Sequence, residues 1–465
     1  MKLLRSPYPL MLLHLILGVL TLIIFDGTGD SGDSIYHYLY ARSAPDHPEL
    51  YFDHWAKPLF VLLYSPMAQI GFIGVQLLNL LVVNATLYFT YQTAKKLDIP
   101  SPYFTLILLI FSPLYFVLTF SGLTEPLFAF FLILAFFMQL NKRHALAIVL
   151  ISFLPFVRSE GLFFIGIFGL WEVLRGRYTS LLFLLTGSFI YGLAGYFVHN
   201  DFFWTITKIP YSKLSSTYGS GTALHFIEQL IYVVGIPFYL LFWIGFLFLT
   251  VHYFLRRTSF KLVYFLLGSV VAFILAHTIF WYYGIFNSMG LKRVLICVIP
   301  FMALIATYGL SQIQFILQHF SYRLAGAIVY IFALYTMVFP FTKNPAAIDF
   351  KHDLNLHVEQ VQANKIANYI NAHYKEPKII VGNTYFCEIL NIDCFDPSRK
   401  SFITPEAIET AQPGDLIIWD NWFSIVEHGI SLDYLINQPN FKLVFETENT
   451  DNRERYSKMV LFEVY

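Results

Sequence analysis

Residues 8–38 read YPLMLLHLILGVLTLIIFDGTGDSGDSIYHY. The apolar run from Tyr8 to Phe25 is close to the roughly 20 residues that a helix needs to cross a bilayer. It lacks a small-residue cleavage site at its end, so we interpret it as a retained signal-anchor helix. Three carboxylates follow it directly, those of Asp26, Asp30 and Asp33. Because ionisable groups beside a bilayer are costly, their position indicates a function.

The composition of the 465-residue chain is typical of a many-span membrane protein. Hydrophobic residues make up 57% of it and charged residues only 13%, whereas about 25% of the residues in soluble domains are charged. The formal net charge is zero, so nothing indicates a nucleic-acid partner. The many Phe and Tyr residues are expected where aromatic belts mark both membrane interfaces.

Apolar runs predict a polytopic α-helical membrane domain over residues 1–344, with about eleven transmembrane helices. The predicted spans are 8–25, 74–94, 103–120, 126–140, 144–157, 161–174, 179–199, 227–250, 261–283, 294–313 and 324–341.

Charge predicts the orientation of these spans. The pairs Lys95–Lys96 and Arg256–Arg257 lie in short loops on one face, which the positive-inside rule makes cytoplasmic. The opposite face then carries the first external loop, 26–73, and the tail, 345–465. We expect two short helices of the external loop to lie at the membrane interface, one of them over 58–73.

The tail is polar, and its pattern predicts a small soluble α/β domain over residues 345–465. Cys387 and Cys394 could form a disulfide if the tail faces an oxidising compartment, whereas Cys297 lies in an apolar run and is expected to pack there. The predicted elements are a helix at 358–373 and strands at 378–382, 415–420, 441–446 and 459–464.

The acidic loop offers a candidate catalytic base. Asp33 precedes Ser34-Ile35-Tyr36, a stretch that suits a short helix starting beside the acid. A carboxylate at such a place can take a proton from an acceptor hydroxyl. Helix capping is the alternative, because Asp30 or Asp33 would also make a good N-cap. Capping explains one acid well but not three, so we favour a function for Asp33.

A second charged cluster precedes an apolar helix that begins at Pro58. Lys57 at the start of that helix could meet a phosphate, because a point charge and a helix N-terminus both favour an anion. Interfacial anchoring by Trp55 and Lys57 is an equally good interpretation. His37 and His54 have carboxylates nearby, which leaves a divalent metal possible. Their spacing matches no metal motif, so we predict no metal site.

Charged residues also lie in three later turns on the predicted external face. Glu125 precedes a proline at a helix start, where it could be a second acid of the same site or an acid that the helix dipole favours. Arg158 and Glu160 could act together in the site or only form a mutual ion pair. Lys292 and Arg293 lead into a late span, where they could bind a phosphate or only flank the helix. Acids and bases on one face suit a reaction in which a hydroxyl attacks and a membrane-borne phosphate leaves.

At these residues the chain resembles the GT-C glycosyltransferases, which include dolichyl-phosphate-mannose mannosyltransferases and bacterial aminoarabinose transferases. The likeness covers roughly residues 1–340. The chain lacks the Trp-Trp-Asp-type motif of the oligosaccharyltransferase, which argues against that activity. The motifs that carry it are Gly32-Asp33-Ser34-x-x-His37-Tyr38-x-Tyr40-Ala41, Asp53-His54-Trp55-x-Lys57-Pro58-Leu59, Gly122-x-Thr124-Glu125-Pro126-Leu127 and Arg158-x-Glu160-Gly161.

The resemblance implies inverting transfer of mannose or a similar hexose or pentose from a polyprenyl- or dolichyl-phosphate to a lipid, glycan or protein acceptor. Asp33 matches the proposed general base, a role that Asp30 could take instead. Lys57 matches a lysine that approaches the donor phosphate. Glu125 matches the acid of the second external loop, and Arg293 looks like the basic residue beside the lipid phosphate. The possible supporting residues are His37, His54, Arg158 and Glu160.

Two other functions remain open at this stage. A transporter or flippase of lipid-linked saccharides has a similar outline, but the charges gather on one face and hydropathy shows no inverted repeat. A polymerase or ligase of surface polysaccharide would use a diphosphate-linked donor instead. We expect an integral protein of a bacterial inner membrane, with its active site and tail on the periplasmic side.

Overall fold

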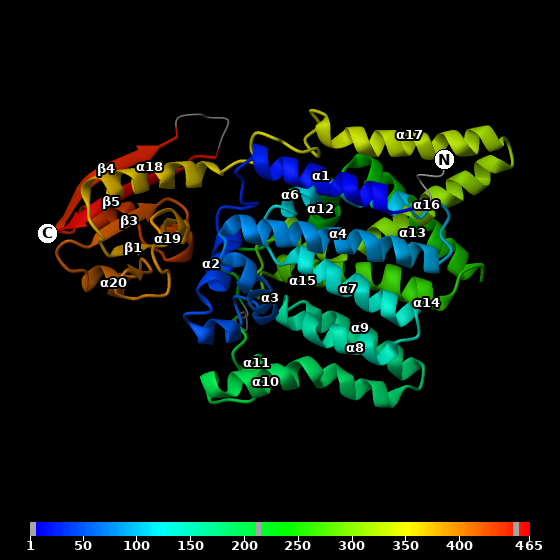
Figure 1. Ribbon diagram of the computed structural model, residues 1–465, viewed down its shortest axis with the longest axis horizontal. Coiled ribbons are helices and arrows are strands. Elements are labelled where there is room, and N and C mark those ends of the chain that lie inside the picture. Colours follow the sequence, from blue (N-terminus) through cyan, green and yellow to red (C-terminus); the bar gives the residue numbers. More distant parts are fainter. Residues whose placement is uncertain (1–5, 211–214, 450–454) are drawn as a thin grey trace.

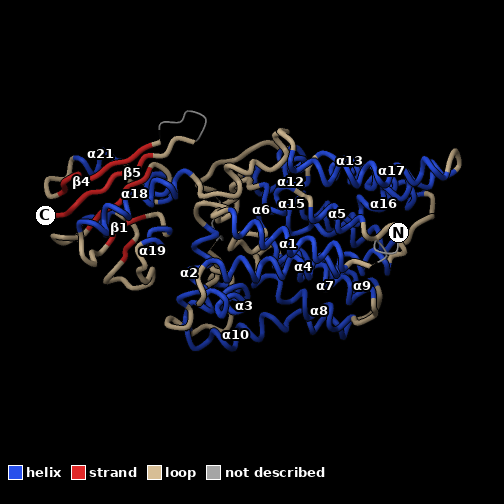
Figure 2. Tube along the Cα trace, turned by 45° about the horizontal axis from the view of Figure 1, so that its top comes forward, coloured by secondary structure: helices blue, strands red, loops and turns tan. Residues whose placement is uncertain are grey.

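The computed structural model describes residues 6–210, 215–449 and 455–465, and it places a bundle of helices beside a small sheet domain (Figure 1). The strands are confined to the C-terminal part of the chain (Figure 2). The helices of the bundle are α1 (Tyr8–Ile24), α2 (Asp33–Ser43), α3 (Pro58–Ala68), α4 (Phe72–Lys96), α5 (Phe104–Ile110), α6 (Pro113–Leu118), α7 (Glu125–Leu140), α8 (His144–Phe153), α9 (Gly161–Leu174), α10 (Thr186–His199), α11 (Trp204–Thr207), α12 (His225–Val234), α13 (Ile236–Phe254), α14 (Phe260–Val263), α15 (Ser269–Tyr283), α16 (Ile299–Gln318) and α17 (Tyr322–Val338). Short 3₁₀ helices are η2 (Pro48–Phe52), η3 (Leu154–Phe156), η4 (Tyr178–Leu185), η6 (Lys292–Val298) and η7 (Phe339–Phe341), and η5 (Tyr264–Gly268) is a π-helical turn.

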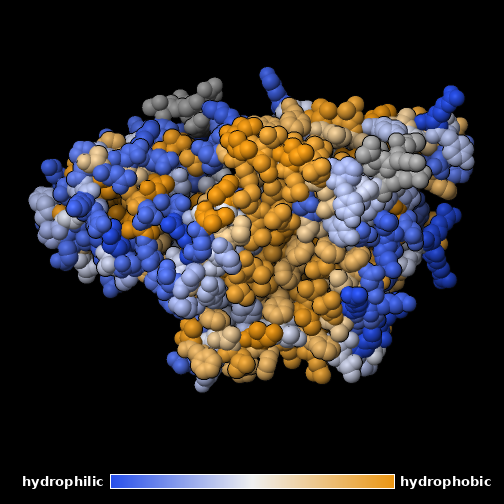
Figure 3. All heavy atoms as spheres, viewed as in Figure 1, coloured by the Kyte–Doolittle hydropathy of each residue, from blue (hydrophilic) through white to orange (hydrophobic). Residues whose placement is uncertain are grey.

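An apolar belt crosses the bundle roughly at right angles to its helices (Figure 3). Hydrophilic residues gather at the C-terminal domain and at the opposite end of the bundle. A bilayer covers such a belt, so the protein is an integral membrane protein. Within the described residues, six helices are long and apolar enough to cross it: Phe72–Lys96, Tyr178–His199, Ile236–Phe254, Phe260–Tyr283, Lys292–Gln318 and Tyr322–Phe341.

Four predicted spans correspond to shorter apolar helices of 10–17 residues: α1, α7, α9 and the segment His144–Phe156. Helices of this length are shorter than the roughly 20 residues that span a typical bilayer. The total of eleven spans therefore stays a prediction.

Two predicted spans are not single helices. The segment 103–120 divides into α5 and α6, because Pro113 has no N–H to donate and Ser112 before it is held in an extended conformation. The segment 227–250 divides at Gly235, whose φ of +78° no helix accommodates. The predicted interfacial helix over 58–73 ends earlier, at Ala68, and α4 begins at Phe72.

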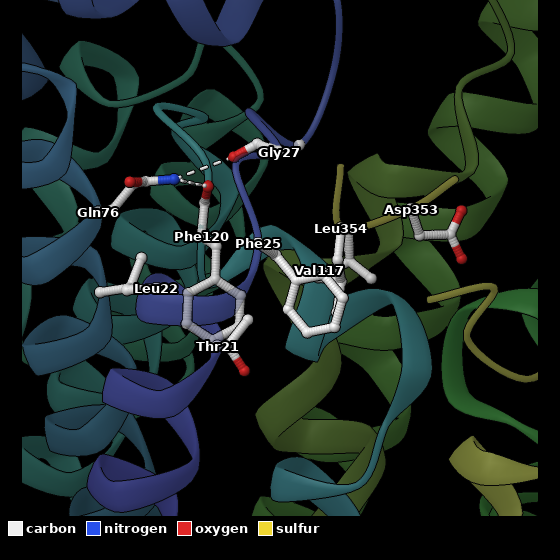
Figure 4. A pocket seen from close by; sticks show the side chains of 10 residues that line it. Thr21, Leu22, Phe25, Gly27, Gln76, Val117, Phe120, Asp353 and Leu354 are labelled. Atoms are coloured by element: carbon white, nitrogen blue, oxygen red, sulfur yellow. Dashed lines mark hydrogen bonds between the residues drawn. The ribbon is translucent and has the colours of Figure 1, made fainter. Parts of the chain in front are cut away.

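A buried amide of α4 joins the start of the first external loop to the loop that follows α6. The side-chain amide of Gln76, in α4, donates hydrogen bonds to the carbonyls of Gly27 (3.0 Å) and Phe120 (2.9 Å), as Figure 4 shows. Gly27 and Phe120 lie at the start of the first external loop and just after α6, respectively. One buried amide therefore sets the distance between the two external loops that carry the predicted acids.

The C-terminal domain is built on a sheet in which the described residues form five strands, in the order β2-β1-β3-β5-β4. The strands β2, β1 and β3 are parallel, whereas β5 runs antiparallel to both β3 and β4. Its strands are β1 (Ile379–Val381), β2 (Lys400–Ser401), β3 (Leu416–Asp420), β4 (Phe441–Glu448) and β5 (Lys458–Val464), and its helices are α18 (Val358–His373), α19 (Tyr385–Ile389), α20 (Pro405–Glu409), α21 (Leu432–Ile436) and the π-helical turn η8 (Phe423–Glu427).

The predicted elements of the tail are confirmed, because each of them carries a clear local pattern. The predicted helix matches α18 residue for residue, and the four predicted strands are β1, β3, β4 and β5. Alternate residues of β3 pack into different cores: Ile417 faces Ile380, and Ile418 packs in the core that α18 covers. Cys297 is buried, as predicted.

A disulfide-closed loop fixes the C-terminal domain to the first external loop. Cys387 and Cys394 form a disulfide. Within that loop, Glu388 pairs with Arg42 of α2 at 2.7 Å, and Asp393 pairs with His47 at 2.7 Å. The loop between the two cysteines is therefore the part of the domain that contacts the far end of α2.

We predict that the disulfide stabilises this contact. Cys387→Ser together with Cys394→Ser should speed amide hydrogen exchange over residues 385–396 by roughly one to two orders of magnitude, because closing a loop of this length contributes about 2–3 kcal/mol. Reductant should have the same effect on the wild-type protein and no effect on the double variant. Equal exchange in oxidised and reduced wild type would contradict the prediction.

Candidate active site

Two acids of the first external loop take different positions at the start of α2. Asp30 Oδ1 accepts hydrogen bonds from the backbone N–H groups of Gly32 (3.1 Å) and Ser34 (2.9 Å). Asp33 is the first residue of the helix, and 43% of its side chain is exposed. Asp30 therefore binds backbone N–H groups at the start of α2, where Gly32 is the N-cap residue, whereas the Asp33 carboxylate remains accessible.

Arg293 lies in η6, late in the sequence of the helix bundle, and it contacts both of these acids. Its guanidinium pairs with Asp30 through Nη1 and with Asp33 through Nη2. Its Nε lies 3.3 Å from Oε1 of Glu125. Burial alone would raise the pKa of the Asp33 carboxyl, but the guanidinium charge of Arg293 outweighs burial and holds this pKa below its usual range. Asp33 is therefore ionised at neutral pH.

Glu125 is the buried centre of this charge cluster. Its Oε1 lies 2.9 Å from Nη1 of Arg158 as well as close to Arg293. Arg158 pairs in addition with Glu160 at 2.8 Å, as the ion-pair interpretation of that turn predicts. The Glu125 side chain is 0% exposed and holds two guanidiniums in this structure. Its role as a second catalytic acid stays a prediction.

A cavity of about 410 Å³ lies beside Asp33, within the range of about 300–1,000 Å³ that is usual for small-molecule sites. Its described lining residues fall into two chemical groups. The charged and hydrogen-bonding residues are Asp33, His37, Trp55, Lys57, Arg158, Ser159, Glu160, Tyr218, His277, Asn287, Ser288 and Arg293. The apolar ones include Leu123, Leu162, Phe163, Ile209, Phe226, Phe280, Phe286, Met289, Leu291 and Val294.

Lys57 reaches the cavity from the N-terminus of α3. It occupies the N-cap position with a φ of +67°, and Pro58 follows as the first helical residue. Its side chain is buried, and its ammonium lies 3.4 Å from the carbonyl oxygen of His54. Burial lowers the pKa of Lys57 to about 8. The group is therefore mostly protonated at neutral pH and loses its charge only slightly above it.

The two predicted supporting histidines separate in the structure. His37 lines the cavity and stacks on Trp55, with ring centroids 4.9 Å apart. Burial lowers the pKa of His37 to about 3, so its imidazole is neutral. His54 instead contacts the carbonyl of Thr205 through Nε2 at 3.0 Å, which ties the first external loop to α11. Only His37 of this pair is among the described lining residues.

The two residues of the predicted basic pair, Lys292 and Arg293, point in different directions. Successive residues of a 3₁₀ helix point in directions about 120° apart. Arg293 accordingly faces the cavity, whereas the ammonium of Lys292 lies over the ring of Tyr232, 5.6 Å from its centroid. Lys292 is exposed and does not belong to the described lining of the cavity.

Two titratable residues among the described cavity lining escaped the sequence analysis. His277, in α15, lies 3.8 Å from Glu160. An ionisable residue inside an apolar helix is a recognised sign of function, so the sequence held the signal for His277. Tyr218 lies in an irregular loop before α12 and carries no periodic pattern, so only the tertiary structure brings it to the site.

The described part of the chain offers no ligand set for the divalent metal that the sequence left possible. No group of three or more His, Cys, Asp or Glu side chains there is arranged to hold a metal ion. The acids of the site instead face the guanidiniums of Arg158 and Arg293.

Comparison with known proteins supports the resemblance at the level of the fold. No known protein family and no curated protein matches the chain by sequence. The crystal structure of ArnT from Cupriavidus metallidurans bound to undecaprenyl phosphate matches with a TM-score of 0.65 and 10% identity, over 98% of this chain and 97% of that one. The apo structure of the same ArnT matches with a TM-score of 0.61 and 10% identity, over 97% of both chains. The chain thus has the same fold as this ArnT, and the likeness extends into the tail beyond residue 340.

The charge cluster leads to a prediction about stability. Glu125→Gln should lower the free energy of unfolding by about 3–5 kcal/mol, because the change leaves two buried guanidiniums without their shared carboxylate. The exposed Glu228→Gln, on α12, is the matched control and should change it by less than about 1 kcal/mol. Unfolding in detergent would measure both. Similar losses in the two variants would contradict the central position of Glu125.

Proposed function

We propose that the protein is a membrane glycosyltransferase that moves a sugar, mannose or a similar hexose or pentose, from a polyprenyl phosphate to a lipid, glycan or protein acceptor. The observation that carries this proposal is the cavity, where one accessible carboxylate, two guanidiniums and a lysine ammonium meet apolar side chains. Such a site suits a donor that combines a sugar, a phosphate and a long apolar chain. The fold of ArnT, one structure of which holds undecaprenyl phosphate, supports the same donor class.

Asp33 acts as the general base in this proposal. The acceptor hydroxyl gives its proton to the Asp33 carboxylate while its oxygen forms the new bond to the anomeric carbon of the sugar. The bond between that carbon and the phosphate oxygen breaks, and the polyprenyl phosphate leaves with the electron pair. Attack on the face opposite the phosphate inverts the configuration at the anomeric carbon.

Lys57 and Arg293 stabilise the leaving phosphate. Negative charge grows on this group as the bond breaks, and fixed cations that face it lower the barrier. In the described structure Arg293 Nη2 is paired with Asp33. A donor phosphate competes with this carboxylate for the same guanidinium, so donor binding releases Asp33 to act as a base. Arg158, held by Glu160, adds a further positive charge to the lining.

We place the site and the C-terminal domain on the non-cytoplasmic side, in a bacterial inner membrane. Lys95 and Lys96 are the last two residues of α4, and Arg256 and Arg257 follow the end of α13. The positive-inside rule assigns such basic helix ends and loops to the cytoplasm. The disulfide between Cys387 and Cys394 also suits an oxidising compartment such as the periplasm.

Asp33→Asn should lower the transfer rate by roughly 10²–10⁴-fold, the usual contribution of a general base, while the protein still folds. Transfer from a panel of radiolabelled undecaprenyl-phosphate sugars to membrane extract would measure the rate. Asp46→Asn, an exposed acid of the same loop, is the matched control and should keep its activity. Full activity of Asp33→Asn would exclude this base. If wild type used no monophosphate donor, a transporter or a diphosphate-dependent ligase would become the better hypothesis.

The pKa of Lys57 predicts a pH dependence. Its ammonium is charged below its pKa of about 8, so kcat/KM for the donor should fall as the pH rises through about 8 and the phosphate loses one cationic partner. Lys57→Arg keeps the charge at all these values and should move the fall to higher pH. Steady-state kinetics between pH 6 and 10 would test this pair. An unchanged profile in Lys57→Arg would show that another group titrates.

A further inference from the structure

One turn of the C-terminal domain lies between two walls of the cavity. The ring of Phe423, the first residue of η8, lies against Gly32, since a Cβ placed on this glycine would be 3.2 Å from Cζ of the ring. At the other end of η8, Glu427 Oε1 accepts a hydrogen bond from the hydroxyl of Tyr218 at 2.5 Å. Asp33, which follows Gly32, and Tyr218 both line the cavity. The turn 423–427 therefore bridges the cavity wall that carries Asp33 and the wall that carries Tyr218.

The sheet holds this turn in place. Asp420, the last residue of β3, accepts hydrogen bonds from the backbone N–H groups of Trp422 (2.9 Å) and Phe423 (2.5 Å). The Asp420 side chain is buried, so the start of the turn is fixed to the core of the domain. The turn follows the carboxyl end of β3, which is parallel to β1. Open α/β sheets usually bind their ligands at the edge formed by the carboxyl ends of such strands.

A second ring from the same edge extends this surface. Phe402 directly follows β2, which is parallel to β1 and β3. It therefore lies at the carboxyl end of a parallel strand, at the same edge of the sheet as the turn. It lies 6.3 Å from the ring of Tyr36, and Tyr36 lies 4.7 Å from Trp55, which lines the cavity. Aromatic rings therefore lead from the cavity to the edge of the sheet.

We infer that this edge of the C-terminal domain is the acceptor subsite and that it binds the sugar ring of a saccharide acceptor. The inference rests on the proposed function. With the donor phosphate on Lys57 and Arg293, the attacking hydroxyl has to reach the anomeric carbon beside Asp33. That carboxylate lies next to Gly32, which the Phe423 ring contacts.

The chemistry of the edge suits a saccharide. Phe402 is 37% exposed and Phe423 is half-buried, and the C–H faces of sugar rings are apolar enough to pack on such rings. The ammonium of Lys400 lies over the Phe402 ring, 2.9 Å from its centroid, and adds a hydrogen-bond donor at this edge. The Glu427 carboxylate accepts hydrogen bonds and already binds one hydroxyl, that of Tyr218. A saccharide ring held on the aromatic faces can present its other hydroxyls to Glu427 and one of them to Asp33.

The test compares three variants within the same turn of the full-length protein. Phe423→Ala removes the ring and Glu427→Gln removes the charge. Ile425→Ala is the matched control, because this side chain is 45% exposed in the same turn. Transfer is measured from the radiolabelled undecaprenyl-phosphate sugar that wild type uses, at varied concentrations of donor and of acceptor. Membrane lipid extract and soluble oligosaccharides released from it by mild acid serve as acceptors in separate arms.

We expect Phe423→Ala to raise the acceptor KM roughly tenfold, as the loss of a buried aromatic contact does at an interface. Glu427→Gln should raise it by a smaller factor. The donor KM should stay at its wild-type value in both variants, and Ile425→Ala should match wild type throughout. Phe423→Leu keeps the apolar bulk and protects the test against a folding defect, since it should raise the acceptor KM without changing the unfolding temperature.

Each outcome decides the inference. Saturable transfer to the oligosaccharides supports a free glycan, and transfer to the lipid extract alone supports a glycolipid headgroup. An acceptor KM unchanged in Phe423→Ala, Phe423→Leu and Glu427→Gln overturns the inference, as does a donor KM that rises in parallel. If wild type transfers no sugar at all, the proposed function itself fails and this inference falls with it.

Discussion

In this helix bundle the carboxylate of Glu125 joins two guanidiniums, since it lies 2.9 Å from Arg158 and 3.3 Å from Arg293. Moving an ion out of water costs several kcal/mol even in a relaxed protein, so these partly buried guanidiniums need carboxylate partners. Glu125 is the enclosed partner that both share, whereas Glu160 pairs with Arg158 alone and Asp30 and Asp33 pair with Arg293 alone. The arrangement requires the turns before α7, before α9 and at η6 to meet at one point. The geometry of the cavity follows from this meeting.

The acids and bases of this cluster differ in chemistry because their surroundings differ. Asp33 lies at the accessible edge of the cluster, where its side chain is 43% exposed and the guanidinium of Arg293 keeps it ionised against the effect of partial burial. Glu125 carries the same functional group, but it is enclosed and serves to hold the guanidiniums. Burial dominates at Lys57 and lowers its pKa, so its charge is the most sensitive to pH among the cations of the site. Side chains of one type thus differ in chemistry because they differ in solvation.

The C-terminal domain is bound to the loop that carries Asp33 at several separate places. Backbone atoms of Gly27 and Leu354 form a hydrogen bond at 2.8 Å, and Arg42 pairs with Glu388 across the same boundary. Helix α2 therefore meets Arg293 of the bundle at its first residue and the domain near its last turn. The fold match with ArnT covers 98% of this chain, so it includes both the helix bundle and the C-terminal domain.

The sequence by itself determined the membrane class, the helix α18 and four strands of the sheet, because hydropathy and periodicity are local properties. It also singled out Asp33, Lys57 and Arg293, since charges stand out in an apolar chain. Only the tertiary structure decided which of these groups a substrate can reach. Burial depends on segments distant in sequence, and it separates the accessible Asp33 from the enclosed Glu125. Side-chain direction separates Arg293, which lines the cavity, from its exposed neighbour Lys292. The approach of the C-terminal domain to the cavity was equally invisible in the sequence, because no local pattern records contacts between residues almost 400 positions apart.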